Sequence, residues 1–202
     1  METKNIMIVG VGGQGSLLSS KLLGHLLLAE GFDVKVSEVH GMSQRGGSVL
    51  TCVRFGDKVY SPVIDKGEAD FIVSFEQMEA ARYLPYLKEG GRIVTNTQMI
   101  EPMPVITGAA AYPENLIEKM QEKGAVVDAM DCLTLAEEAG SVRAVNIVLM
   151  GRLSKYFDIP QKKWEQAIEA LVPEKLRQVN LRAFELGRGE AAHTKQTGNI
   201  QI

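Results

Sequence analysis

Two glycine-rich segments hold the residue types in this chain that could bind or transform a ligand. The first, at residues 10–15, reads GVGGQG directly after the apolar run at residues 6–9 and fits the spacing G-x-G-x-x-G. Glycines at this spacing permit a tight turn, and the free N–H groups of a following helix attract an anion. Two interpretations stay open: a bound dinucleotide, or glycines that serve strand–helix packing and face an anion or a partner's backbone. The candidate residues are Gly10, Gly12, Gly13, Gln14 and Gly15.

The second segment, VHGMSQRGG at residues 39–47, follows the predicted strand at residues 33–38. The forked guanidinium of Arg45 could grip a carboxylate or phosphate, or form a salt bridge that staples the loop. His40 could carry a proton or donate a hydrogen bond to a partner. Catalysis by His40 is the weaker interpretation, because no Ser or Cys nucleophile and no Asp partner is placed beside it.

Three acidic or amide residues extend these hypotheses. Glu38 lies near the end of the second strand, where a dinucleotide site holds its ribose with an acid. Glu76 and Gln77 open a helix right after the strand at residues 71–75, at the edge where doubly wound sheets place their sites. Glu76 could instead complement the dipole of that helix.

The chain has two cysteines, Cys52 and Cys132, which lie far apart and each in an apolar neighbourhood. An iron–sulfur cluster normally takes four thiolates, so this chain cannot hold one alone. We therefore expect two buried, reduced thiols and no metal site.

The elements that must position these residues alternate between strand and helix. The pattern predicts an α/β fold with a Rossmann-like, mostly parallel sheet flanked by helices. Residues 48–55, a turn at 56–57 and residues 58–61 read as an inserted β-hairpin, and residues 105–107 as a short strand. Helices are expected at residues 16–30, 76–87, 113–123, 134–139, 144–157, 161–171 and 173–186, with strands at residues 5–9, 33–38, 69–75, 92–96 and 125–128.

Bulk composition narrows the class of protein. The 202 residues carry a net charge of −3 and no basic stripe, which argues against nucleic-acid binding. No apolar run approaches the ~18 residues of a membrane span, and no signal-peptide pattern precedes the first strand. We expect a cytoplasmic protein with a single domain over residues 1–188 and a flexible tail over residues 189–202.

Several longer motifs resemble the gamma-type subunits of 2-oxoacid:ferredoxin oxidoreductases. They include GVGGQG, SEVHGMSQRGGSV at residues 37–49, VYSP at 59–62, FEQME at 75–79 and PMPVI at 102–106, and they span nearly all of residues 5–188. The HGMSQR version of the second loop favours the branch of small (beta) subunits of the indolepyruvate enzymes. The expected fold is that of a pyruvate/ketoacid oxidoreductase gamma-type domain.

The resemblance implies a reaction carried out by a complex, namely oxidative decarboxylation of a 2-oxoacid, such as an aryl pyruvate, to an acyl-CoA. Thiamine diphosphate, iron–sulfur clusters and coenzyme A are expected on the complex through a larger partner subunit, and ferredoxin would accept the electrons. This chain would carry no cofactor and no catalytic residue. The resemblance places a partner-facing surface at the second loop, namely His40, Gly41, Ser43, Gln44, Arg45, Gly46 and Gly47.

One alternative stays open from the sequence: a free-standing oxidoreductase that binds NAD(P) or a flavin at residues 10–15. Such an enzyme should carry a placed acid or base and a substrate lobe, and the C-terminal helices show no polar constellation of that kind. Isolated, the chain could also form a homodimer.

Overall fold

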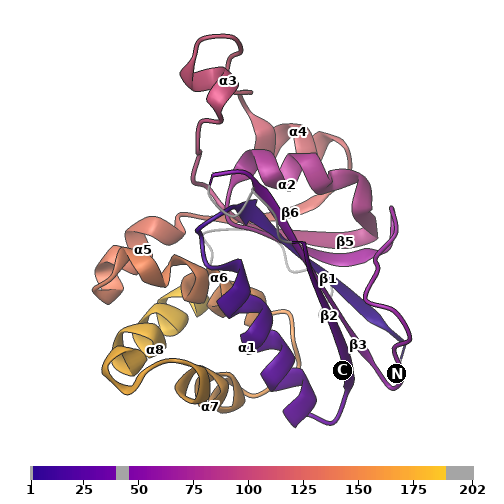
Figure 1. Ribbon diagram of the computed structural model, residues 1–202, viewed down its shortest axis with the longest axis vertical. Helices are drawn as coiled ribbons and strands as arrows, with labels where there is room; N and C mark the ends of the chain where they lie inside the picture. Colours follow the sequence, from indigo (N-terminus) through magenta and orange to yellow (C-terminus); the bar gives the residue numbers. More distant parts are fainter. Residues whose placement is uncertain (1, 40–45, 190–202) are drawn as a thin grey trace.

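A mixed six-stranded sheet runs through the computed structural model, which describes residues 2–39 and 46–189 (Figure 1). The strand order is β2-β3-β1-β4-β5-β6. β1, β4, β5 and β6 pair in parallel, whereas β3 is antiparallel to both β1 and β2. The strands are β1 (Lys4–Val11), β2 (Asp33–Val39), β3 (Ser48–Gly56), β4 (Ala69–Ser74), β5 (Leu87–Asn96) and β6 (Val126–Met130).

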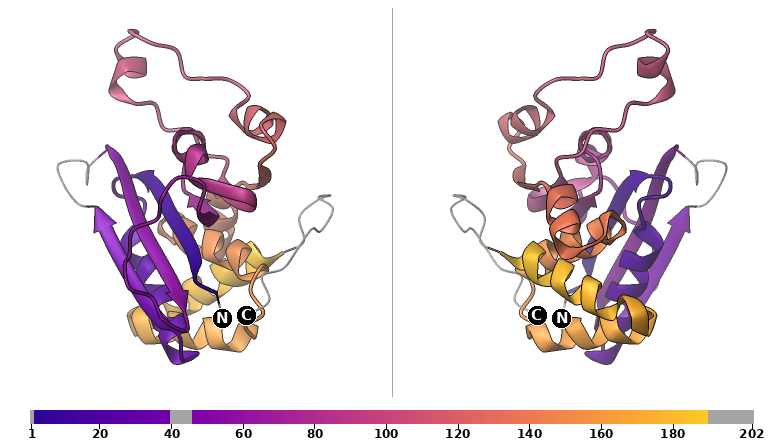
Figure 2. Two further views of the ribbon diagram at one scale, coloured as in Figure 1. Left: turned by 90° about the vertical axis from the view of Figure 1, so that its right-hand side faces the viewer. Right: turned by 90° about the vertical axis from the view of Figure 1, so that its left-hand side faces the viewer.

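Helices cover both faces of the sheet (Figures 1 and 2). On one face lie α1 (Ser16–Ala29), α5 (Cys132–Ala139), α6 (Val145–Ser154), α7 (Gln161–Leu171) and α8 (Glu174–Arg188). Of these, α1 and α6 pack on the strands, whereas α5, α7 and α8 pack mainly on other helices. The other face of the sheet packs against α2 (Gln77–Tyr83) and α4 (Leu116–Glu122). The 3₁₀ turns η2 (Leu84–Tyr86) and η3 (Val142–Ala144) complete these layers, and α3 (Met103–Ile106) projects beyond them.

The central strand β1 shows why the sequence reads as an unbroken apolar run. Ile6 and Ile8 enter the core under α1 and α6, whereas Met7 and Val9 enter the core under α2 and α4. Successive side chains of a strand point to opposite faces, so a strand covered on both faces must be apolar at every position. The predicted α/β fold with its mostly parallel sheet is confirmed.

Two predicted elements are wrong. The inserted hairpin was expected to pair residues 48–55 with residues 58–61, but β3 pairs with β2 and β1 instead. Residues 58–61 form no strand, and the N–H of Val59 donates a hydrogen bond to Asp33 Oδ2 at 2.9 Å. The predicted short strand at residues 105–107 belongs instead to α3 and its C-terminal cap.

None of the described helices has both the length and the apolar composition that crossing a membrane takes.

Candidate functional site

The two glycine-rich segments meet at one edge of the sheet. The N–H of Gly12 donates to the carbonyl oxygen of Gly47 at 2.8 Å, and the N–H of Gly46 donates to that of Gly12 at 3.3 Å. These bonds continue the antiparallel ladder in which Val11 faces Ser48. The other predicted residues of the second loop, His40, Gly41, Ser43, Gln44 and Arg45, lie outside the described residues.

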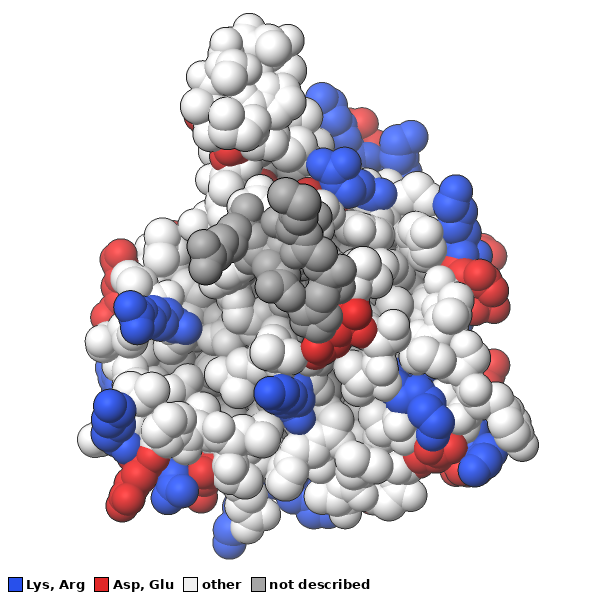
Figure 3. All heavy atoms as spheres, in the orientation of Figure 1, with Lys and Arg blue, Asp and Glu red and all other residues white. Residues whose placement is uncertain are grey.

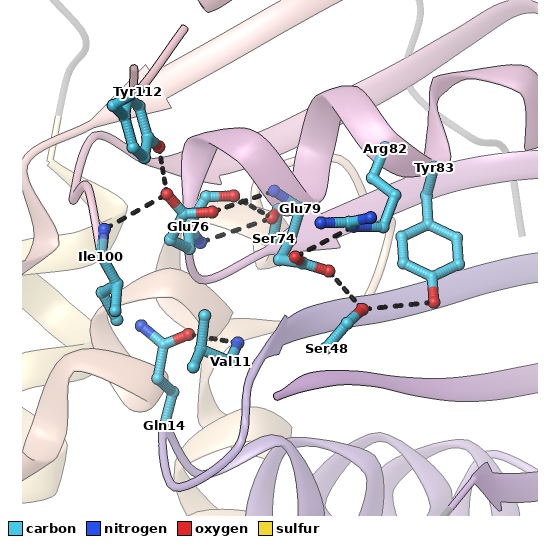
Figure 4. A network of polar contacts seen from close by, with 10 residues as sticks. All are labelled: Val11, Gln14, Ser48, Ser74, Glu76, Glu79, Arg82, Tyr83, Ile100 and Tyr112. Atoms are coloured by element: carbon cyan, nitrogen blue, oxygen red, sulfur yellow. Dashed lines mark hydrogen bonds and ion pairs between the residues drawn. The ribbon is translucent and has the colours of Figure 1, made fainter. Parts of the chain in front are cut away.

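Gln14 fixes the shape of the first segment (Figure 4). Its Oε1 accepts the N–H of Val11 at 2.7 Å, and its Nε2 donates to the carbonyl oxygen of Phe75 at 3.1 Å and to Gln98 Oε1 at 3.3 Å. A Cβ on Gly10 would lie 2.9 Å from Gln14 Oε1 and 3.0 Å from Phe75 Cβ. Gly10 is thus required by packing within the chain itself.

The remaining glycines of the segment divide into two kinds. Gly15 precedes α1 with φ +90°, and a Cβ there would lie 2.7 Å from Asn146 Nδ2, which donates to the Gly15 carbonyl oxygen at 3.3 Å. Gly13 has φ +104° and no described atom within 4 Å of a Cβ built on it. Gly15 therefore allows close contact with α6, whereas the outer side of Gly13 is open to a ligand or partner.

A cavity of about 350 Å³ opens beside this edge. Glu38 lies on its wall and accepts a hydrogen bond from Ser20 Oγ at 2.7 Å. In a dinucleotide fold the strand carrying the ribose-binding acid lies next to the first strand, but here β3 separates β2 from β1. The lining residues are Gly12, Gly13, Gly15, Ser16, Leu17, Glu38, Val39, Val49 and Thr51.

Glu76 is fully buried and binds three groups of its own chain (Figure 4). Its Oε2 accepts the N–H of Glu79 at 2.9 Å and so caps α2, as the dipole interpretation anticipated. Its Oε1 accepts the N–H of Ile100 at 3.3 Å and the hydroxyl of Tyr112. Burial and this bond to a carboxylate raise the pKa of Tyr112, so its hydroxyl stays protonated and donates.

Gln77 has a similar role within the chain. Its N–H donates to the carbonyl oxygen of Gln98 at 3.2 Å, and its side chain donates to that of Thr97. Glu76 and Gln77 thus hold the backbone that follows β5.

Glu79 was not among the predicted site residues, although it lies close to the second glycine segment. It is buried, accepts the hydroxyl of Ser48, and accepts Arg82 Nε at 3.1 Å (Figure 4). Ser48 directly follows Gly47, so this contact ties the second segment to α2. The signal that could have found it is the carboxylate spacing Glu76-x-x-Glu79, which is typical of a capped helix start.

The cysteines lie in separate cores on the two faces of the sheet. Cys52 belongs to the core under α2 and α4, and Cys132 to the core under α5 and α6. Both are free and buried, and desolvation raises both thiol pKa values. Across residues 2–39 and 46–189, no three His, Cys, Asp or Glu side chains come together as a metal site.

A family model described as pyruvate ferredoxin/flavodoxin oxidoreductase matches residues 5–190. The chain belongs to this family. The resemblance seen in the motifs is confirmed, and the protein is a subunit of a 2-oxoacid:ferredoxin oxidoreductase.

Individual relatives agree with this assignment. The chain is 46% identical over 192 residues to indolepyruvate oxidoreductase subunit IorB of Thermococcus kodakarensis, covering 93% of this chain and 95% of that one. It is 38% identical over 191 residues to IorB of Archaeoglobus fulgidus, covering 93% and 94%.

Solved structures show the same fold. Pyruvate oxidoreductase subunit PORC of Thermotoga maritima has a TM-score of 0.69 at 21% identity, with 93% of this chain and 96% of that chain covered. The 2-oxoglutarate:ferredoxin oxidoreductase of Magnetococcus marinus has a TM-score of 0.71 at 21% identity, with 93% of this chain but only 31% of that chain covered.

Proposed function

We propose that this chain is the small subunit of an indolepyruvate:ferredoxin oxidoreductase, which converts an aryl pyruvate and coenzyme A to an acyl-CoA, CO₂ and reduced ferredoxin. The observation that carries the proposal is the difference in sequence identity between two groups of relatives. Four IorB proteins are 35–46% identical to the chain, whereas subunits named for 2-oxoglutarate or for pyruvate and ketoisovalerate are 25–28% identical.

An iron–sulfur cluster does not fit the cysteines of this chain. An iron–sulfur cluster takes four thiolates, and the two cysteines here are buried in different cores. We assign the clusters, and with them thiamine diphosphate and the coenzyme A site, to a larger partner subunit that passes electrons to ferredoxin. We further propose that the complex lies in the cytoplasm and that residues 1–188 of this chain act as one domain.

The role left to this chain is to complete the assembly at the edge where the glycine segments meet. Gly13 supports this role, because its outer side is open, whereas Gly10 and Gly15 are in close contact with other residues of the chain. Gly46 and Gly47 lie beside it, and we assign His40, Gly41, Ser43, Gln44 and Arg45 to the same partner-facing surface.

The purified chain alone should be colourless and should not turn over an aryl pyruvate with coenzyme A and a low-potential electron acceptor. Co-expression with the large subunit should yield a brown complex that does. Ultraviolet–visible spectra and the same assay on both preparations check this. Cluster-bound iron or turnover in the isolated chain would contradict the proposal, and activity with pyruvate but not with an aryl pyruvate would contradict the substrate.

Nicotinamide dinucleotides should not stabilise the chain. A ligand present at ~100 times its Kd adds roughly 2.7 kcal/mol to the free energy of unfolding. NAD and NADP at millimolar concentration should leave the melting temperature unchanged, because β3 separates Glu38 from the strand that carries the glycine turn. A shift of several degrees in differential scanning fluorimetry would restore the dehydrogenase alternative.

A further inference from the structure

The chain between β5 and α4, residues 97–115, leaves the body of the protein and returns to it (Figures 1 and 2). This projecting arm carries α3 at its far end, beyond both helical layers. Connections longer than ~12–15 residues are uncommon in compact domains, and those that occur are usually functional. The arm is therefore longer than a link between β5 and α4 needs to be, and its length indicates a further function.

The tip of the arm is shaped by its own hydrogen bonds. The N–H of Ile106 donates to the carbonyl oxygen of Pro102 at 3.1 Å, that of Thr107 to Met103 at 2.9 Å, and that of Ala110 to Pro104 at 3.0 Å. Among the described residues, no hydrogen bond or ion pair joins residues 101–111 to the body. The tip is thus organised before it meets any other surface.

The arm exposes large apolar side chains and almost no charge. Met99, Met103 and Ile106 are 62%, 66% and 60% exposed, and residues 97–113 include a single charged residue, Glu101. Figure 3 shows the tip as an uncharged knob above a body whose surface carries both signs of charge. Clustered exposed apolar side chains mark interaction sites, and methionine adapts to irregular pockets.

Both legs of the arm are held at its root by one buried carboxylate. Glu76 Oε1 accepts the N–H of Ile100 on the outgoing leg and the hydroxyl of Tyr112 on the returning leg (Figure 4). Gln98 on the outgoing leg also accepts Gln14 Nε2 from the first glycine segment at 3.3 Å. The root of the arm is therefore joined to the first glycine segment, and both of its legs are anchored at Glu76.

We propose that the projecting arm docks on the large subunit of the complex by placing Met103 and Ile106 in an apolar socket. This inference rests on the proposed function. Because the tip carries no charge, the surface that receives it must be apolar. Because the root of the arm contacts the first glycine segment, this socket should lie on the partner that faces the glycine segments. A four-residue helix alone falls short of the ~800 Å² per partner of a stable interface, so the arm extends that surface instead of forming a separate dimer contact.

Preorganisation supports this use of the arm. Pro102 and Pro104 restrict the outgoing leg and the start of α3, and Pro113 restricts the returning leg. A segment that is already ordered loses less conformational entropy when it binds. The tip can therefore contribute affinity although it is small.

The test uses the full chain co-expressed with the large subunit. The double variant Met103→Asp/Ile106→Asp should raise the Kd of the complex about 30-fold or more, as for hot-spot residues. Its activity should recover at high subunit concentration, because the defect lies in assembly. The melting temperature of the free variant should match the wild type, because residues 101–111 have no bonded contact with the body.

Leu28→Asp and Tyr60→Asp are the matched controls, because these side chains are 60% and 89% exposed away from the arm. Both should bind the large subunit like the wild type. If the wild-type chain does not bind the large subunit, the proposed function fails and the arm proposal with it. If the wild type binds and the double variant binds equally well, the arm proposal alone is wrong. It is also wrong if the double variant loses only self-association in gel filtration, since the occupant would then be a second copy.

Discussion

Replacing Gly187 by alanine should destabilise the protein by about 3 kcal/mol, at the upper end of the usual cost of overpacking. Gly187 on α8 lies against α6, and a Cβ there would be 2.0 Å from the carbonyl oxygen of Val148. The reciprocal contact is as close, with a Cβ on Gly151 falling 2.2 Å from the carbonyl oxygen of Phe184. Backbone atoms cannot rotate away, so the two helices would have to separate. At ~2–4 °C per kcal/mol, the melting temperature should fall by roughly 6–12 °C.

Gly24→Ala is the matched control for this result. Gly24 is buried within α1, but the nearest described atom to a Cβ there is Val36 Cγ2 at 3.9 Å, which is ordinary contact. Alanine favours a helix over glycine by about 1 kcal/mol, so this variant should be as stable as the wild type or more so. Thermal unfolding by circular dichroism checks both variants. Equal melting temperatures for Gly187→Ala and Gly24→Ala would contradict the close crossing of α6 and α8.

The sequence predicted the helical layer well because proline and apolar spacing mark helix starts clearly. The helix expected at residues 161–171 is α7 as observed, and the one expected at 173–186 differs from α8 by one residue at its start and two at its end. Pro160 and Pro173 each precede the first helical residue, where a missing N–H costs nothing.

The errors arise where strand partners had to be inferred. Alternation identifies β3 as a strand but not its neighbours, and β2 and β1 turned out to flank it. The run Val105-Ile106-Thr107 has the composition of a strand, yet no neighbouring strand is available on the projecting arm. Propensity alone does not make a strand, because its N–H and C=O groups need a paired neighbour.

The position of the glycine segments at the ends of their strands was predictable, but their contacts within the chain were not. The spacing of the glycine segments located the sheet edge, whereas the contact of Gly15 with Asn146 spans 131 residues and leaves no local signal. The projecting arm was missed for a related reason. Met103 and Ile106 have the composition of core residues, and only the fold shows that they face away from it.

Asp128→Ala should be the most destabilising single truncation that we predict. Asp128 on β6 binds Arg152 of α6 through two bonds, from Nε at 2.6 Å and from Nη2 at 2.9 Å, and both side chains are buried. Tyr156 donates its hydroxyl to the same carboxylate; burial and this bond raise the pKa of Tyr156 to about 12, so it stays protonated. Removing one partner of a buried ion pair costs ~3–5 kcal/mol, because the other charge stays desolvated.

The comparison that isolates burial is Glu138→Ala. Glu138 pairs with Arg182 at 3.3 Å, but their side chains are 52% and 55% exposed. Exposed pairs contribute ~0.2–1 kcal/mol, so this variant should unfold within 1 kcal/mol of the wild type in urea. Asp128→Ala should unfold at a much lower urea concentration than the wild type. Arg152 would keep its bond to the Gly189 carbonyl oxygen at 2.9 Å but lose its counter-ion. If the two variants unfold at similar urea concentrations, the Asp128–Arg152 pair is not desolvated. Its proposed role in holding α6 on β6 would then be wrong.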